Sequence, residues 1–106
     1  MDIYLTSKFR KAYKKLPKQV KEKAKLKEQI FRENPFDPRL ETHPLGGKYK
    51  GYWAFSIDKS YRIIFQFLDA TKAKVAFINV GTHEIYKYSV KSTAPGLKME
   101  SHQLKN

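Results

Sequence analysis

The chain has 106 residues, and its 22 Lys and Arg against 10 Asp and Glu give a net charge of +12. This length suits one domain. Because 41% of the residues are hydrophobic and 14% are aromatic, the chain can fill a core, which excludes wholesale disorder. The absence of Cys excludes disulfides, iron–sulfur clusters and thiolate zinc sites, and the three histidines form no short-range pair. We therefore expect no metal and no cofactor.

The N-terminal segment lacks the apolar core of a signal peptide, and no stretch approaches the roughly 20 apolar residues that a membrane span needs. The composition therefore predicts a soluble, cytoplasmic protein without a membrane partner. A charge of +12 on so small a chain attracts polyanions. Nucleic acid is the abundant polyanion of the cytoplasm, so it is the first candidate partner.

The first third of the chain predicts a short strand over residues 3–6 and then two helices. Ser7 is expected to cap the first helix, because apolar residues follow it at helical spacing. These residues are Phe9, Ala12, Tyr13 and Leu16. Pro17 suits the first turn of the second helix, which Pro35 ends. The apolar stripe of this helix comprises Val20, Ala24, Leu26, Ile30 and Phe31.

The expected helical hairpin also holds much of the net charge, because residues 8–27 contain ten basic residues and one acidic residue. A charge run is often only a solvated surface. The length and one-sidedness of this run favour electrostatic attraction to a polyanion.

The middle of the chain predicts three antiparallel strands over residues 51–57, 61–68 and 74–81, with polar turns between them. Side chains alternate along a strand, so the central strand should turn one face to the helices. That face comprises Tyr61, Ile63, Phe65 and Phe67. The opposite face would place Arg62 in mid-sheet with Gln66 nearby, where a ligand could reach them. Residues 89–106 show no sustained period and are expected to form a flexible or partner-folded tail.

Three residues are candidates for chemistry on that second face. His43 precedes the three strands and His83 follows them, so both could reach the same edge as Arg62. For a lone histidine, the alternative is a solvated surface residue. For Arg62, the alternative is a surface arginine paired with an acid.

Cations and aromatic residues alternate just before the first of these strands. Lys48, Lys50 and Trp53 stand in such a run, a pattern typical of proteins that stack single-stranded bases and contact phosphates. The alternative for Trp53 is a residue of the core.

Three segments together resemble the RelE/ParE superfamily of bacterial and archaeal type II toxins, on its RelE-like mRNA interferase side. They are residues 43–53 (HPLGGKYKGYW), 60–65 (SYRIIF) and 80–86 (VGTHEIY). The resemblance covers roughly residues 1–88, which we expect to be the toxin domain. It implies an α+β fold in the order β-α-α-β-β-β, with the helical hairpin packed on one face of a small, mainly antiparallel sheet.

The resemblance implies that His43, Arg62 and His83 form an RNA cleavage site. RNA carries its own nucleophile, the 2′-OH, so cleavage without a metal needs a base, an acid and a cation for the phosphorane charge. Histidine serves either proton role near neutrality, and a guanidinium holds phosphate without losing its charge. We assign the clamp to Arg62, the acid to His83 and the base to His43. Tyr86 could stack on or orient a base, or could simply pack.

The chain departs from some relatives at four positions. Trp53 and Phe55 stand where some carry a lysine pair, while Ser56 and Ser60 stand where some carry His and Asp. Asp58 could replace the missing acid, or could be a turn residue.

The resemblance therefore implies a ribosome-dependent, metal-independent endoribonuclease that inhibits translation. Its partners would be an acidic cognate antitoxin, the ribosome and mRNA. One alternative is a ParE-like gyrase inhibitor, a binding protein without a cleavage site, which the joint presence of His43, Arg62 and His83 disfavours. The other is a basic nucleic-acid-binding module without catalysis.

Overall fold

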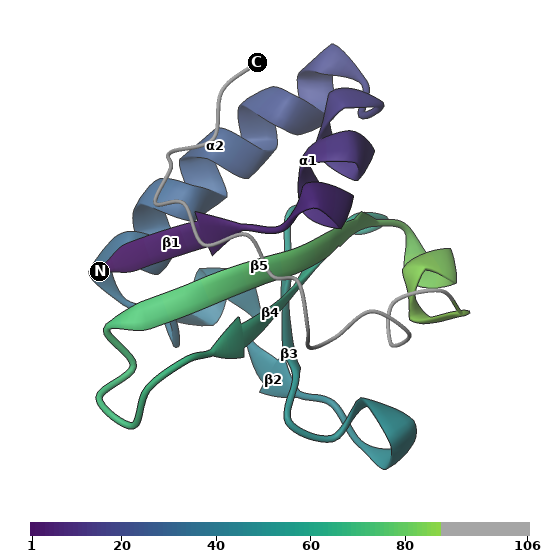
Figure 1. The fold of residues 1–106 in the computed structure, drawn as a ribbon. Coiled ribbons are helices and arrows are strands. Elements are labelled where there is room, and N and C mark those ends of the chain that lie inside the picture. The colour runs from purple at the N-terminus through teal and green to yellow at the C-terminus, as the bar shows by residue number, and fades with distance from the viewer. Residues whose placement is uncertain (88–106) are drawn as a thin grey trace.

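Two helices pack on one face of a five-stranded sheet in the computed structural model, which describes residues 1–87 (Figure 1). The strands are β1 (Asp2–Leu5), β2 (His43–Pro44), β3 (Trp53–Ser56), β4 (Arg62–Phe67) and β5 (Lys74–Gly81). The helices are α1 (Ser7–Lys14) and α2 (Lys18–Glu33), with short 3-10 turns η1 (Pro38–Leu40), η2 (Gly47–Tyr49) and η3 (His83–Lys87). The expected tail, residues 89–106, lies outside the described residues.

The sheet has the order β1-β5-β4-β3-β2, in which β1 pairs with β5 in parallel and the other neighbours are antiparallel. This arrangement confirms the α+β fold and the three central strands. Strand β2 was not expected, because two residues at a sheet edge leave no periodic pattern in the sequence. The expected order of six elements therefore gains one more strand.

The start of α1 differs by one residue from the prediction. Thr6, and not Ser7, caps the helix: its Oγ1 accepts a hydrogen bond from the Phe9 N–H at 3.0 Å. The same hydroxyl donates to the Ile78 carbonyl of β5 at 3.0 Å. Thr6 keeps the extended backbone of β1 and is buried, so it can serve both contacts, whereas Ser7 is exposed.

Helix α2 buries a different stripe from the one expected. Val20, Ala24 and Phe31 are buried as predicted, but the side chain of Leu26 is 61% exposed. Glu28, which was not expected there, is buried on the sheet-facing side of α2, where its carboxylate lies 2.6 Å from the Arg32 guanidinium.

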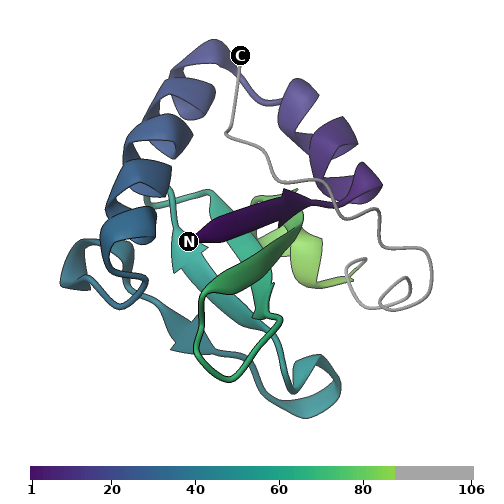
Figure 2. The same cartoon turned by 60° about the vertical axis from the view of Figure 1, so that its left-hand side comes forward.

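A second contact of Arg32 joins α2 to the N-terminus. The Arg32 guanidinium donates to the Met1 carbonyl at 3.1 Å. Figure 2 shows the N-terminus beside the C-terminal half of α2. The polar pair on α2 therefore fixes the helix to the start of β1.

Phe31 lies at the centre of the core between the helices and the sheet. Its ring centroid is 4.8 Å from that of Phe55, 4.9 Å from Phe65 and 5.6 Å from Phe77. One side chain of α2 thus contacts β3, β4 and β5, and such ring pairs add about 0.5–1.5 kcal/mol beyond their area burial. The packing of Ile63, Phe65 and Phe67 toward the helices is confirmed.

The sequence suggested that the opposite face of the sheet is open to a ligand, but the structure shows that it is covered. It carries a second, smaller core of Tyr52, Ile64, Ala76, Ile78 and Ile85. Ile85 comes from η3, which folds back over this face and leaves little room beside Gly81: a Cβ there would clash with the Ile85 side chain. Of the β4 residues on this face, Ile64 is buried, whereas Arg62 and Gln66 are half-buried.

A β-bulge in β5 allows both cores to form. Ile64 pairs with Asn79 and Phe65 pairs with Phe77, so Ile78 is the extra residue. The bulge lets Phe77 and Val80, three residues apart, both face the helices, while Ile78 joins the second core.

Replacing Phe31 should test the main core. We expect Phe31→Ala to lower the free energy of unfolding by about 3–5 kcal/mol, because it leaves a cavity among three rings. Leu26→Ala, on the exposed side of the same helix, should change it by less than about 0.5 kcal/mol. Urea unfolding followed by circular dichroism measures both. Equal effects of the two substitutions would contradict this description of the core.

Candidate functional site

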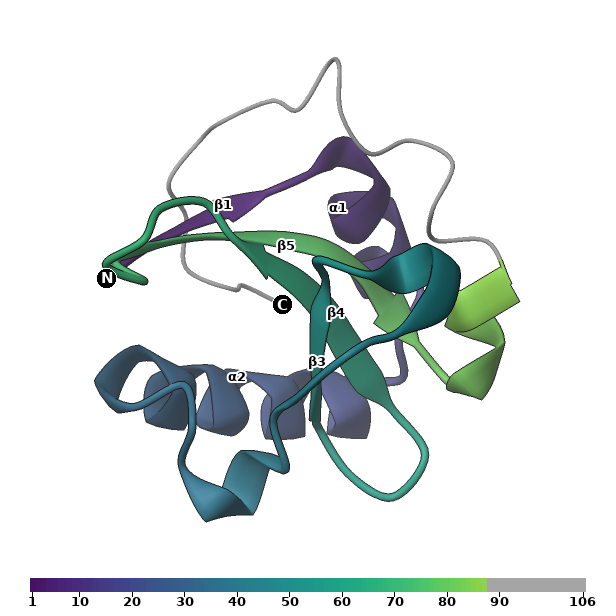
Figure 3. The ribbon, with the colours of Figure 1, turned by 90° about the horizontal axis from the view of Figure 1, so that it is seen from below.

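Arg62 and His83 both lie at one end of the sheet. The sequence predicted a mid-sheet position for Arg62, but Arg62 is the first residue of β4, where it pairs with Ser56 of β3 and Gly81 of β5. His83 follows Gly81 by two residues and begins η3, with an exposed side chain. Figure 3 shows η3 beyond the end of β5, away from α2.

His43 lies farther along the same face. It pairs with Ala54, and Ala54 pairs with Ile64, two residues along β4 from Arg62. Paired residues share a face, so His43 and Arg62 lie on the side opposite the helices. Two strand spacings across and two residues along give roughly 12 Å between their Cα atoms. The register therefore places Arg62 at the strand end from which η3 and His83 follow, and places His43 two strands away.

The ring of His43 is fixed by the backbone. Its Nδ1 lies 2.9 Å from the Glu41 carbonyl oxygen, which can only accept, so Nδ1 is the donor. Glu41 presents this carbonyl from a left-handed conformation, with φ 53°, at the end of η1. In the neutral ring the lone pair is then on Nε2, which is free to accept a proton.

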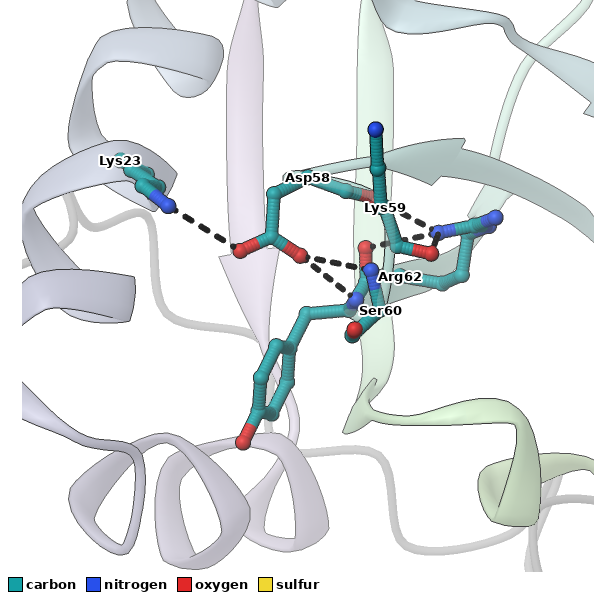
Figure 4. A network of polar contacts seen from close by, with 6 residues as sticks. Lys23, Asp58, Lys59, Ser60 and Arg62 are labelled. Atoms are coloured by element: carbon teal, nitrogen blue, oxygen red, sulfur yellow. Dashed lines mark hydrogen bonds and ion pairs between the residues drawn. The ribbon is translucent and has the colours of Figure 1, made fainter.

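The guanidinium of Arg62 is held by carbonyl groups (Figure 4). Its Nη1 donates to the carbonyls of Asp58 at 2.9 Å, Tyr61 at 3.2 Å and Lys59 at 3.3 Å. Within residues 1–87 it has no carboxylate partner, so the alternative of an arginine paired with an acid is not observed. Because carbonyl oxygens carry no net charge, they hold the Arg62 guanidinium without cancelling its positive charge.

Both carboxylate oxygens of Asp58, in the β3–β4 turn, have partners: one binds the turn backbone and the other a lysine of α2. Oδ1 accepts from the backbone N–H groups of Ser60 and Tyr61, each at 2.9 Å, and Oδ2 lies 3.4 Å from the Lys23 ammonium. Burial raises the pKa of the Asp58 carboxyl, but these backbone hydrogen bonds and Lys23 outweigh burial and lower it. Because both oxygens of this carboxylate already have partners, the structure favours Asp58 as a turn residue over Asp58 as a replacement for the missing catalytic acid.

The residues suggested for RNA contacts lie in different places. Lys48 on η2 and Lys50 after it are exposed in the loop between β2 and β3. Trp53 lies on the helix side, half-buried, with its ring centroid 5.5 Å from those of Phe36 and Phe67. The structure favours packing for Trp53. Tyr86 belongs to η3, but its side chain falls outside the described part.

A basic cleft lies beside α1. It has a volume of about 240 Å³ and is lined by Leu5, Ser7, Arg10, Lys11 and Lys14. Three cationic side chains around one hollow suit a polyanion.

Two further properties concern metals and membranes. Among residues 1–87 no three His, Asp or Glu side chains gather as metal ligands. In the same part of the chain, neither helix is long and apolar enough to cross a bilayer.

Several solved structures resemble this chain. YafQ from Escherichia coli BL21(DE3) is 25% identical with a TM-score of 0.63, over 80% of this chain and 96% of its own. YafQ in the E. coli DinJ–YafQ toxin–antitoxin complex is 27% identical with a TM-score of 0.59, over 77% and 91%. The YoeB/ParE toxin from Agrobacterium tumefaciens, 20% identical over 78% and 99%, shares the fold with a TM-score of 0.67. No curated protein matches the chain significantly.

A family model gives the assignment. It is described as the bacterial toxin of type II toxin–antitoxin systems, YafQ, and it matches residues 1–87. This match covers all of the sheet and both helices, including Arg62 at the start of β4 and His83 at the start of η3. The chain therefore belongs to the YafQ family of toxins from type II toxin–antitoxin systems, within the RelE-like superfamily.

Proposed function

We propose that this toxin cleaves mRNA on the ribosome, without a metal, by attack of the 2′-OH on the adjacent phosphate. The observation that carries the proposal is the charged guanidinium of Arg62, which carbonyl oxygens of the β3–β4 turn hold at the strand end from which His83 follows. A cation in this state can stabilise the negative charge of a phosphorane.

The three side chains suit separate roles in this reaction. His43 would take the 2′-OH proton on Nε2, since its Nδ1 is bonded to the Glu41 carbonyl. His83 would protonate the leaving 5′-oxygen. In this proposal the phosphodiester would lie between His43 and His83, because an in-line displacement needs the base and the acid on opposite sides of the phosphorus.

The basic surface supports a role for the ribosome. Three side chains are a sparse catalytic set, so positioning of the mRNA must come from elsewhere. The cleft beside α1 and the lysines of α2 offer phosphate contacts to ribosomal RNA.

An antitoxin is the proposed protein partner. The similar YafQ from E. coli forms a toxin–antitoxin complex with DinJ. The +12 charge of this chain suits an acidic segment that folds as it wraps the toxin.

Removal of a site residue should abolish cleavage without unfolding the protein. We expect Arg62→Ala and His83→Ala each to lower the cleavage rate about 10²–10³-fold, because each removes a group aimed at the transition state. Lys72→Ala, which removes a charge from the turn at the other end of β4, should cleave as the wild type does. Primer extension on mRNA translated with each variant measures the rate. Wild-type cutting by either variant would remove that residue from the site.

Cleavage should depend on ribosomes. Purified toxin should cut naked mRNA at a small fraction of its rate on programmed ribosomes, because the ribosome orients the phosphate. Equal rates would contradict the proposal. Ribosome-independent binding to RNA without cutting would favour the basic binding module, and inhibition of gyrase without RNA cleavage would favour the ParE-like alternative.

Association with the antitoxin should weaken with salt. The attraction between a basic toxin and an acidic partner is screened over about 8 Å at physiological ionic strength, so the association rate should fall as salt rises. Co-expression with the product of the neighbouring reading frame, followed by stopped-flow mixing at several salt concentrations, measures this rate. A rate indifferent to salt would contradict the electrostatic account, and a neighbour that does not bind would contradict the choice of partner.

A further inference from the structure

The turn between β3 and β4 is built around one carboxylate. Asp58 Oδ1 accepts from the N–H groups of Ser60 and Tyr61, and the Ile57 N–H donates to the Tyr61 carbonyl at 2.9 Å. A side-chain oxygen that accepts from the backbone two and three residues later is a known way for Asp and Asn to set a turn. The conformation of the turn therefore depends on the carboxylate of Asp58.

The same turn supplies the oxygens that hold Arg62. The carbonyls of Asp58 and Lys59 lie within the turn, and that of Tyr61 ends it. Figure 4 shows the Asp58 carboxylate and the Arg62 guanidinium on opposite sides of this turn. The carboxylate thus acts on the guanidinium through the backbone and does not neutralise it.

Helix α2 keeps the carboxylate in this orientation. Lys23 reaches Oδ2 from 35 residues away, while Oδ1 is used by the turn. With both oxygens engaged, Asp58 is not drawn into an ion pair with Arg62. This matters because an ion pair would cancel the charge that a phosphorane needs.

We propose that Asp58 is a positioning residue, whose carboxylate sets the β3–β4 turn so that its carbonyls hold the charged guanidinium of Arg62 in place. This inference rests on the proposed RNA cleavage for its effect on rate. The competing role is proton transfer by Asp58 itself.

Two conservative variants separate these roles. Asp58→Asn keeps an oxygen for the two N–H groups but cannot accept a proton at neutral pH. Asp58→Glu keeps a basic carboxylate but moves it by one methylene, away from the turn N–H groups. Positioning predicts that the Asn variant retains kcat within about threefold and the Glu variant loses about tenfold or more, with KM for programmed ribosomes unchanged. Proton transfer predicts the reverse order.

Asp69 offers a control in another turn. Its Oδ1 accepts from the N–H groups of Ala73 and Lys74, four and five residues later in the β4–β5 turn, and no arginine lies on that turn. Asp69→Glu should lower the melting temperature about as much as Asp58→Glu and leave kcat unchanged. Equal losses of kcat in both variants would show a merely structural role and overturn the proposal.

A double variant shows whether Asp58 acts through Arg62. In an Arg62→Ala background, Asp58→Glu should cause no further loss of kcat. An additional tenfold loss there, or an inactive Asp58→Asn, would overturn the proposal.

A measurement that does not depend on cleavage activity completes the test. The side-chain nitrogen signals of Arg62 in ¹⁵N NMR should show restricted rotation in the wild type and in Asp58→Asn, and averaging in Asp58→Glu. If rotation of the Arg62 side chain is restricted but the wild-type protein does not cleave mRNA, the proposed function is contradicted and the positioning by Asp58 is not. Free rotation in the wild type overturns the positioning.

Discussion

The pairing of β4 with β5 is the constraint on which the rest of this structure depends. Its register places Arg62 opposite Gly81, two residues before His83 and the start of η3. The bulge at Ile78 in the same pairing turns Phe77 toward the helices and Ile78 toward the second core. A slip by one residue would exchange the two faces, separating the site residues and exposing both cores.

The protein uses its arginines in two ways. Arg32 and Arg39 bond to the carboxylates of Glu28 and Asp37, at 2.6 Å and 2.8 Å, and Arg39 holds the pKa of Asp37 to about 2. These pairs are structural and locally neutral. Arg62 is bound only by carbonyl oxygens among the described residues, so its charge is retained. In a chain with so few acids, this difference marks the arginine that can serve an anionic substrate.

Local patterns predicted most of the fold. The helical spacing of Phe9 and Tyr13, the stops at prolines and the alternation on β4 each depend on a few neighbouring residues, so they were visible in the sequence. The errors share a cause. Thr6 caps α1 because its hydroxyl also reaches β5, and Glu28 can be buried on the stripe of Val20 and Ala24 because Arg32 pairs with it. Each depends on a partner that local spacing does not reveal.

The sequence by itself determined the charge, the helices, the three central strands and the motif residues His43, Arg62 and His83. Only the tertiary structure decided how these residues are arranged, because the register of β4 and the bulge in β5 set their separations. It also favours packing over base stacking for Trp53 and a turn residue over a substitute acid for Asp58. A tryptophan or an aspartate can pack, stack, cap or transfer a proton, and which of these it does is set by residues far away in the chain: Phe67 beside Trp53, and Lys23 beside Asp58.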